Sequence, residues 1–215
     1  MDYLSELEYL SSIEQKRSLR VITDRQGKYV TIKNKQFLDF SSNDYLGIAG
    51  DKGLREKFLK EIDLAEYPFS SSASRLMSGN FLLNEQLESI LSKFYKGKEV
   101  LVFGSGFQAN TGIIPALIGK KDVIFADKQV HASIIHGILL SGAKLYRYKH
   151  NDMTSLRELL EKHRSSFENA WIITESIFSM DGDIADIKQI IEYKNQYSLS
   201  VFVDGFLTIF SNSNN

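Results

Sequence analysis

The feature that most constrains the fold is a regular alternation of short apolar runs and amphipathic segments from about residue 100 onward. Such alternation is typical of βαβ units, which build a mostly parallel sheet covered by helices on both faces. We therefore predict an α/β fold, a three-layer sandwich with a mostly parallel sheet. The predicted strands are 100–103, 123–126, 145–148, 171–174 and 199–203. The predicted helices are 106–118, 131–140, a segment around Leu156–Leu160 capped by Asn151 or Asp152, and 184–197.

The residues before this region follow other patterns. Apolar residues at three-residue spacing predict an amphipathic helix over 3–19, and two short β-prone runs around a polar turn predict a hairpin over 29–40. A helix is expected over 51–65, and Asn84 is placed to cap another. The composition of 69–80 by itself is that of a surface loop.

Composition excludes several classes of protein. The 26 basic and 27 acidic residues give a net charge of −1, which argues against a nucleic acid or an acidic membrane as the main partner. Because cysteine is absent, disulfide scaffolds and thiolate metal sites are excluded. The acidic N-terminus does not resemble a signal peptide, and no apolar run reaches the ~20 residues of a membrane helix. We expect a soluble cytoplasmic protein.

Chemistry is expected where the predicted strands end. In a parallel sheet, ligands bind beyond the carboxyl ends of the strands. No pair of histidines at metal-binding spacing accompanies a carboxylate, so no metal site is predicted. No Gly-x-Ser-x-Gly elbow occurs, which argues against a hydrolase triad. The residues at these ends are Gly104-Ser105-Gly106, Asp127, His131, His150, Glu175, Ser176, Ser179 and Asp204.

The glycine turn at 104–106 has two possible functions. It opens a predicted helix directly after a predicted strand, where free N–H groups favour an anion such as phosphate, or it is a tight turn with no ligand. Residues 104–109 also match Gly-x-Gly-x-x-Ala, and Asp127 follows at the distance of a ribose-binding acid. A dinucleotide-binding oxidoreductase is therefore a rival hypothesis.

Asp204 and His131 each have a functional and a structural interpretation. A carboxylate that ends an apolar strand needs a partner, and Asp204 could pair with a protonated pyridinium nitrogen or cap a helix. His131, at the start of a predicted helix, could serve the same site or be a cap or packing residue.

Several segments together make the chain resemble the α-oxoamine synthases, a branch of the fold-type-I pyridoxal-phosphate enzymes. They occur in that family's order between residues 40 and 204. They are Phe40–Gly47, Ser74–Asn80, Ser105–Asn110, Asp127 through Ser133, His150–Asp152 and Glu175–Asp183.

The resemblance implies an activity and a cofactor. The family uses pyridoxal phosphate to join an amino acid to an acyl thioester with loss of CO₂, and its members are homodimers with sites at the subunit interface. By resemblance, Ser105, Gly106 and Phe107 would hold the cofactor phosphate, His131 would stack on the ring, and Ser179 would bond near its phenolic oxygen. Asp204 would pair with the ring nitrogen, whereas Arg20 and Asn43 would contact substrate.

The sequence also departs from the family pattern. After Asp204 an expected acidic-Ala-His run is missing, Leu207 stands where the His is expected, and no residue corresponds to the Schiff-base lysine. The expected organisation is an N-terminal helix and small-domain segment over 1–50, an incomplete cofactor-binding large domain over 51–204 and an aberrant tail over 205–215. The hypotheses are an enzyme whose sequence is cut short, an inactive remnant, and a non-catalytic interaction module. We expect no activity from the 215 residues alone.

Overall fold

A computed structural model of the chain describes residues 2–63, 67 and 70–205. The chain separates into two compact units, one ending at Phe81 and one beginning at Leu82. The domain boundary placed at residue 50 from the sequence stays a prediction. The predicted features of residues 206–215 lie outside the described part of the chain.

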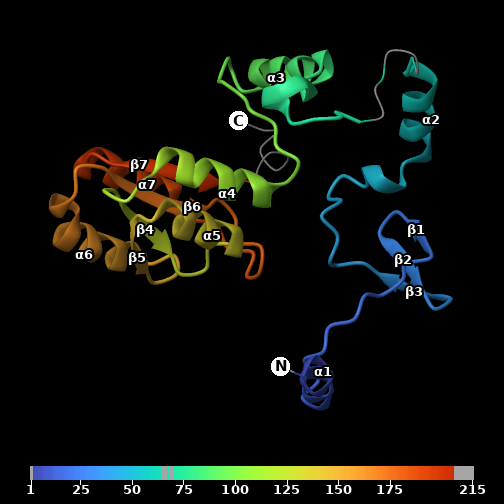
Figure 1. The fold of residues 1–215 in the computed structure, drawn as a ribbon, viewed down its shortest axis with the longest axis horizontal. Coiled ribbons are helices and arrows are strands. Elements are labelled where there is room, and N and C mark those ends of the chain that lie inside the picture. Colours follow the sequence, from blue (N-terminus) through green and yellow to red (C-terminus); the bar gives the residue numbers. More distant parts are fainter. Residues whose placement is uncertain (1, 64–66, 68–69, 206–215) are drawn as a thin grey trace. The chain divides into compact units, whose positions relative to one another are not determined.

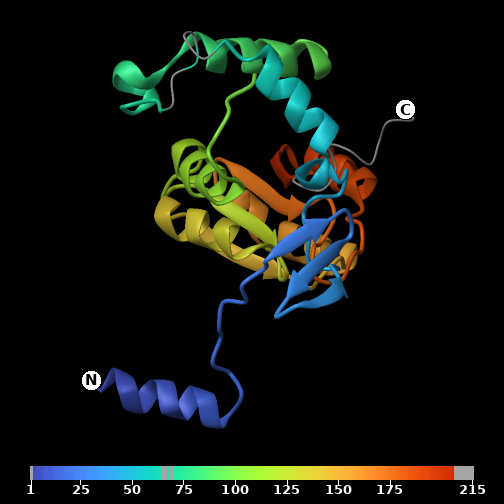
Figure 2. The ribbon, with the colours of Figure 1, turned by 90° about the vertical axis from the view of Figure 1, so that its right-hand side faces the viewer.

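The first unit contains a small antiparallel sheet with the strand order β1-β2-β3 (Figure 2). Lys33 and Asn34 join β2 to β3 with φ values of 49° and 61°, which is the left-handed geometry that two-residue hairpin turns prefer. The predicted hairpin is therefore confirmed. The strands are β1 (Asp24–Gln26), β2 (Tyr29–Ile32) and β3 (Lys35–Leu38).

The helices of this unit differ in part from the predictions. Helix α1 (Tyr3–Ser12) ends well before residue 19, because Glu14 adopts a left-handed φ of 56° that an α-helix cannot continue through. Helix α2 (Lys52–Glu61) confirms the predicted helix, and Asp51 caps it. The segment expected to be a loop contains a π-helical turn over Arg75–Gly79, and a short 3₁₀ helix spans Ile48–Gly50.

The second unit contains a parallel sheet with the strand order β5-β4-β6-β7 (Figure 1). Its fold confirms the α/β prediction of a mostly parallel sheet between helical layers. The strands are β4 (Val123–Asp127), β5 (Lys144–Tyr148), β6 (Ala170–Glu175) and β7 (Ser200–Asp204). The helices are α3 (Leu82–Phe94), α4 (Gly106–Leu117), α5 (Ala132–Ser141), α6 (Met153–His163), the 3₁₀ turn Arg164–Ser166, and α7 (Ile187–Tyr197).

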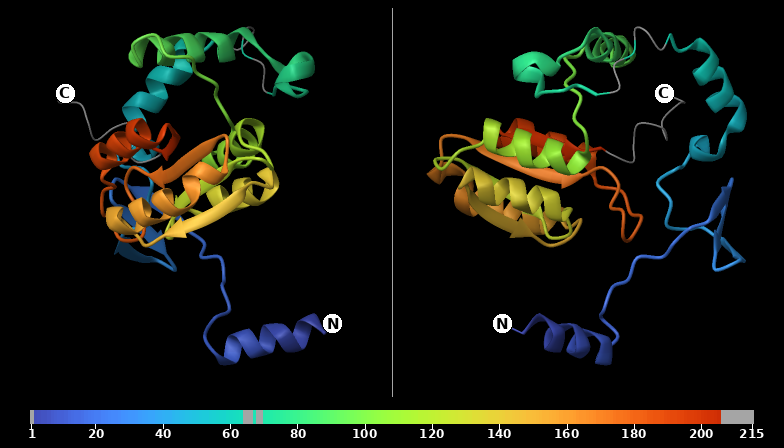
Figure 3. Two further views of the ribbon diagram at one scale, coloured as in Figure 1. Left: turned by 90° about the vertical axis from the view of Figure 1, so that its left-hand side faces the viewer. Right: turned by 45° about the vertical axis from the view of Figure 1, so that its right-hand side comes forward.

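Helices lie on both faces of this sheet (Figure 3), and alternate residues of each central strand belong to two separate apolar clusters. Phe125 and Ile172 face the cluster that α6 and α7 complete. Ile124 and Ile173 face the cluster that α4 and α5 complete. All four of these side chains are fully buried, which is the pattern of a parallel sheet covered on both faces.

Three local predictions are wrong. Residues 100–103 form no strand, and the N–H of Val102 instead donates to Glu88 Oε1 at 2.8 Å, so the described sheet has four strands rather than five. Helix α3 begins at Leu82, so Asn84 lies inside it and is not its cap. Helix α7 begins only at Ile187, because Ile184 pairs with Ile177 in a β-bridge.

Candidate functional site

A chain of hydrogen bonds joins the carboxyl ends of the sheet to two helices. Asn110, on α4, donates from Nδ2 to Asp204 Oδ2 at 2.8 Å and to Ser133 Oγ at 2.9 Å. Ser133 Oγ lies 2.7 Å from His131 Nδ1, and the backbone N–H of His131 donates to Glu175 Oε1 at 2.5 Å. These five residues are called the Asp204 network below. They bring together three of the strand-end residues singled out in the sequence.

His131 is the N-cap of α5. Its Nδ1 accepts from the N–H of Ser133 at 3.2 Å while the rest of the residue is exposed. This confirms the capping interpretation. The bonds at Nδ1 hold the imidazole in a defined orientation, and Ser133 and Asn110 connect it to Asp204.

Glu175 is the buried carboxyl of the network, with 7 % of its surface exposed. Burial raises its pKa above the usual value, and the nearby charges of Asp204 and Asp127 raise it further, while the N–H of His131 opposes the shift. The site therefore contains two carboxyl groups that differ in burial: Glu175, at the end of β6, is buried, whereas Asp204, at the end of β7, is partly exposed.

The N-terminus of α4 lies one helical turn from this network. Ser105 caps the helix by accepting from the N–H of Gln108 at 3.1 Å. The first N–H groups of an α-helix, here those of Gly106 and Phe107, have no acceptor within the helix and favour an anion. Asn110 follows Gly106 by four residues, a rise of about 6 Å along the axis. The helix start, where an anion is favoured, and the residue that binds the Asp204 carboxylate thus lie about one turn apart on α4.

A second polar cluster lies at the ends of β4 and β5. Asp127 is 1 % exposed, and its Oδ1 and Oδ2 accept from His150 Nδ1 at 2.9 Å and from the N–H of Asn151 at 2.8 Å. His150 Nε2 lies 2.9 Å from Asp183 Oδ2, to which Asn151 Nδ2 also donates at 3.0 Å. Burial alone lowers the pKa of His150, but the bonds and charges of Asp127 and Asp183 outweigh it and raise the pKa.

His150, Asp181 and Asp183 lie close enough to hold a metal ion, since one ligand atom from each lies within 4.8 Å of the others. Within the described residues, both nitrogens of His150 already face carboxylates. The expectation of no metal site stays a prediction.

The remaining predicted site residues are not members of the Asp204 network. Ser179 is exposed at the tip of the hairpin formed by residues 177–184. Arg20 and Asn43 belong to the first unit, where both are exposed and Arg20 lines a hollow with Phe37 and Phe40. Their substrate-binding roles therefore stay predictions.

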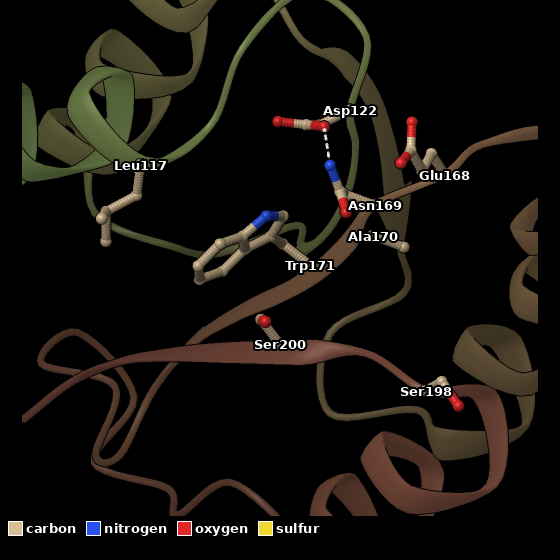
Figure 4. A pocket seen from close by; sticks show the side chains of 8 residues that line it. All are labelled: Leu117, Asp122, Glu168, Asn169, Ala170, Trp171, Ser198 and Ser200. Atoms are coloured by element: carbon tan, nitrogen blue, oxygen red, sulfur yellow. Dashed lines mark hydrogen bonds between the residues drawn. The ribbon is translucent and has the colours of Figure 1, made fainter.

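A polar hollow of about 290 Å³ lies at the opposite, amino-terminal end of the strands. Figure 4 shows Trp171 and Leu117 beside it, with Asn169 donating to Asp122 at 3.0 Å. The Asp204 network has no member there. The structure thus separates this hollow from the candidate site.

Sequence reasoning did not assign roles to Asn110 and Ser133. Both are buried polar residues on helices, at 5 % and 1 % exposure. Asn110 belongs to the segment that carries the resemblance, and its position one turn after the glycine turn is the signal that could have identified it.

A family model described as aminotransferase class I and II matches residues 35–210. The chain belongs to this family. It is also 46 % identical over 203 residues to an 8-amino-7-oxononanoate synthase of Haemophilus ducreyi. The matched region covers 92 % of this chain and 52 % of that protein. The chain therefore spans about half the length of the curated relatives it matches.

Solved structures give the same fold. A serine palmitoyltransferase of Sphingomonas wittichii superposes with a TM-score of 0.82 at 25 % identity, over 94 % of this chain and 51 % of that one. An 8-amino-7-oxononanoate synthase of Francisella tularensis gives 0.56 at 34 % identity, over 72 % and 41 %. In the described part of this family member, no helix is long and apolar enough to cross a membrane.

The geometry around Asp127 and Gly104 argues against the rival hypothesis of a dinucleotide-binding site. Both carboxylate oxygens of Asp127 accept bonds from the protein, so the acid is not presented to a ribose. The segment before Gly104 is not a strand, although the fingerprint requires one.

Proposed function

We propose that this chain carries the pyridoxal-phosphate-binding part of an acyltransferase that joins an amino acid to an acyl thioester with loss of CO₂. Within the family, its segments most resemble 8-amino-7-oxononanoate synthase, which uses a pimeloyl thioester in biotin biosynthesis. A glycine C-acetyltransferase-like activity is the second candidate. A cytoplasmic location and a homodimer are part of the proposal.

The Asp204 network is the observation that supports it. A pyridine cofactor with a phosphate arm needs a carboxylate for its ring nitrogen, an anion site and a flat side chain for its face. Asp204, the α4 N-terminus and His131 are groups of these three kinds, linked through Asn110 and Ser133. The residues present therefore fit the group.

Each residue then has a defined task. Gly106 and Phe107 would donate backbone N–H bonds to the phosphate, and Ser105 would complete that end. Asp204 would hold a proton on the ring nitrogen, oriented by the amide of Asn110. The bound cofactor supplies an electron sink for the negative charge that forms at the amino-acid α-carbon.

The first experiment is titration of the 215-residue chain with pyridoxal phosphate, followed by absorbance and equilibrium dialysis. We expect saturable binding without a stoichiometric lysine adduct after borohydride reduction, because no residue here corresponds to the Schiff-base lysine. Asp204→Asn should weaken binding by about tenfold to a hundredfold, the usual effect of losing a charge-assisted bond.

Glu192→Gln is the matched control, since Glu192 is an exposed acid on α7. It should bind the cofactor as the parent chain does. Absence of saturable binding, or equal affinity of Asp204→Asn and Glu192→Gln, would refute the proposed site.

A further inference from the structure

We propose that His150 is a positioning residue that locks the hairpin of residues 177–184 onto the sheet and thereby sets the position of Ser179. The proposal rests on the proposed function only where it concerns the cofactor. The locking itself is a property of the fold.

The hairpin is held together by few bonds of its own. Ile177 and Ile184 form one antiparallel bridge. The N–H of Phe178 donates to Asp183 O at 2.9 Å, and the N–H of Gly182 donates to Phe178 O at 2.8 Å. Ser179 and Asp181 at its tip are exposed, so the position of the tip depends on how the base of the hairpin is attached.

His150 makes that attachment on three sides. Its Nδ1 lies 2.9 Å from Asp127, which ends β4, and its Nε2 lies 2.9 Å from Asp183 of the hairpin. The ring also meets Phe178 edge-on with centroids 4.4 Å apart. Phe178 is 2 % exposed, so it anchors the hairpin in the interior. One imidazole thus connects the end of β4 to both arms of the hairpin.

The attachment depends on the protonation of His150. Two carboxylates can both accept from an imidazole only when both ring nitrogens carry protons. The charged groups near the ring are Asp127, Asp183 and, within 4.8 Å, Asp181. Asp127 and Asp183 favour the protonated form. The neutral ring keeps one N–H, and the buried Asp127 is the acceptor that can least do without it. Loss of the proton therefore removes the bond between His150 and Asp183, and the hairpin keeps its attachment through Asn151 Nδ2, which donates to Asp183 Oδ2 at 3.0 Å and to Ile184 O at 2.8 Å.

The direction of the pH effect follows from the raised pKa of His150. The stabilisation is fully present below the unfolded-state pKa of about 6.5 and is lost as the pH rises through the higher folded-state pKa. The hairpin is thus held by His150 and Asn151 together at slightly acidic pH, and it loses the bond from His150 to Asp183 above the folded-state pKa.

The test is amide hydrogen exchange of Phe178 and Gly182 as a function of pH, corrected for intrinsic rates, in buffers with EDTA so that no divalent ion replaces the proton. In the parent chain, protection of these amides should fall by about tenfold or more as His150 deprotonates. His150→Phe should remove this step. His163→Gln is the control, because His163 stacks on Tyr146 with centroids 4.0 Å apart and should leave the profile unchanged.

Asp183→Asn separates locking from mere packing. Its amide can donate to the unprotonated Nε2 of a neutral His150, so this variant should keep the hairpin protected at high pH, where the parent loses protection. Equal profiles in the parent, His150→Phe and Asp183→Asn would overturn the proposal. Since exchange is measured without cofactor, that result is independent of the cofactor titration. With cofactor, a locked Ser179 predicts that affinity falls over the same pH interval in the parent but not in Asp183→Asn.

Discussion

Replacing Asn110 by Ala tests whether the Asp204 network is a stabilising unit. The side chain is 5 % exposed and makes two bonds, one to the Ser133 hydroxyl and one to the Asp204 carboxylate. The first contributes about 1 kcal/mol and the second about 1.5–3 kcal/mol. Alanine returns about 0.5 kcal/mol because it is the better helix former. We expect a net loss of about 2–3.5 kcal/mol in the free energy of unfolding.

The assay is urea denaturation followed by the fluorescence of Trp171, the chain's one tryptophan, which lies on β6 of the same unit. With a slope of about 1–3 kcal/mol per molar urea, the midpoint should fall by about 0.7–3.5 M. Thr111→Ala is the control, since the Thr111 hydroxyl donates to carbonyls of its own helix, and it should change stability by less than about 0.5 kcal/mol.

Asn110→Asp extends this test, because it places a carboxylate against Asp204. We expect it to be less stable than Asn110→Ala at neutral pH and to recover on acidification, as like charges are neutralised. The reasoning is refuted if Asn110→Ala and Thr111→Ala have equal midpoints, or if Asn110→Asp shows no dependence on pH.

Two further predictions concern the same unit. Gly137→Ala should destabilise it by about 1–3 kcal/mol in thermal or urea unfolding, because a Cβ there would lie 2.5 Å from the backbone oxygen of Asn110; an unchanged stability would show that α4 and α5 can separate freely. Glu175→Gln should gain stability relative to the parent as the pH rises above about 4.5, because a carboxyl whose pKa is raised by folding loses stability over that interval; parallel curves of unfolding free energy against pH would contradict this.

The fold could be read from the sequence to the extent that burial imposes a pattern. Strands β4 and β6 are apolar on both faces, as a covered parallel sheet requires, and their positions were predicted closely. Residues 100–103 are equally apolar, yet no strand forms there in the described part, because an apolar run becomes a strand only where a neighbour accepts its hydrogen bonds.

The residues of the candidate site could be predicted in part, but the contacts between them could not. Residues at strand ends, such as Asp204 and His131, could be listed because topology places them at one edge. The contacts between them could not, because they depend on how α4 packs against α5. Gly137 permits that close approach, and it is the approach that brings Asn110 to Ser133. Helix–helix distance has no local signature in the chain.

The Asp204 network and the hairpin of residues 177–184 are both attached to the end of β6. Glu175 closes the Asp204 network, and Ser176, the next residue, begins the connection to the hairpin. The N–H of Ser176 donates to Asp204 O at 2.9 Å, while the N–H of Ala185 beyond the hairpin donates to Ser176 O at 3.1 Å. A hairpin that has lost the bond between His150 and Asp183 is therefore still bound at its base, beside Asp204. Loss of that bond should loosen Ser179 while leaving Asp204 and Asn110 in place, so Asp183→Asn should change the pH dependence of cofactor affinity without the loss of stability expected of Asn110→Ala.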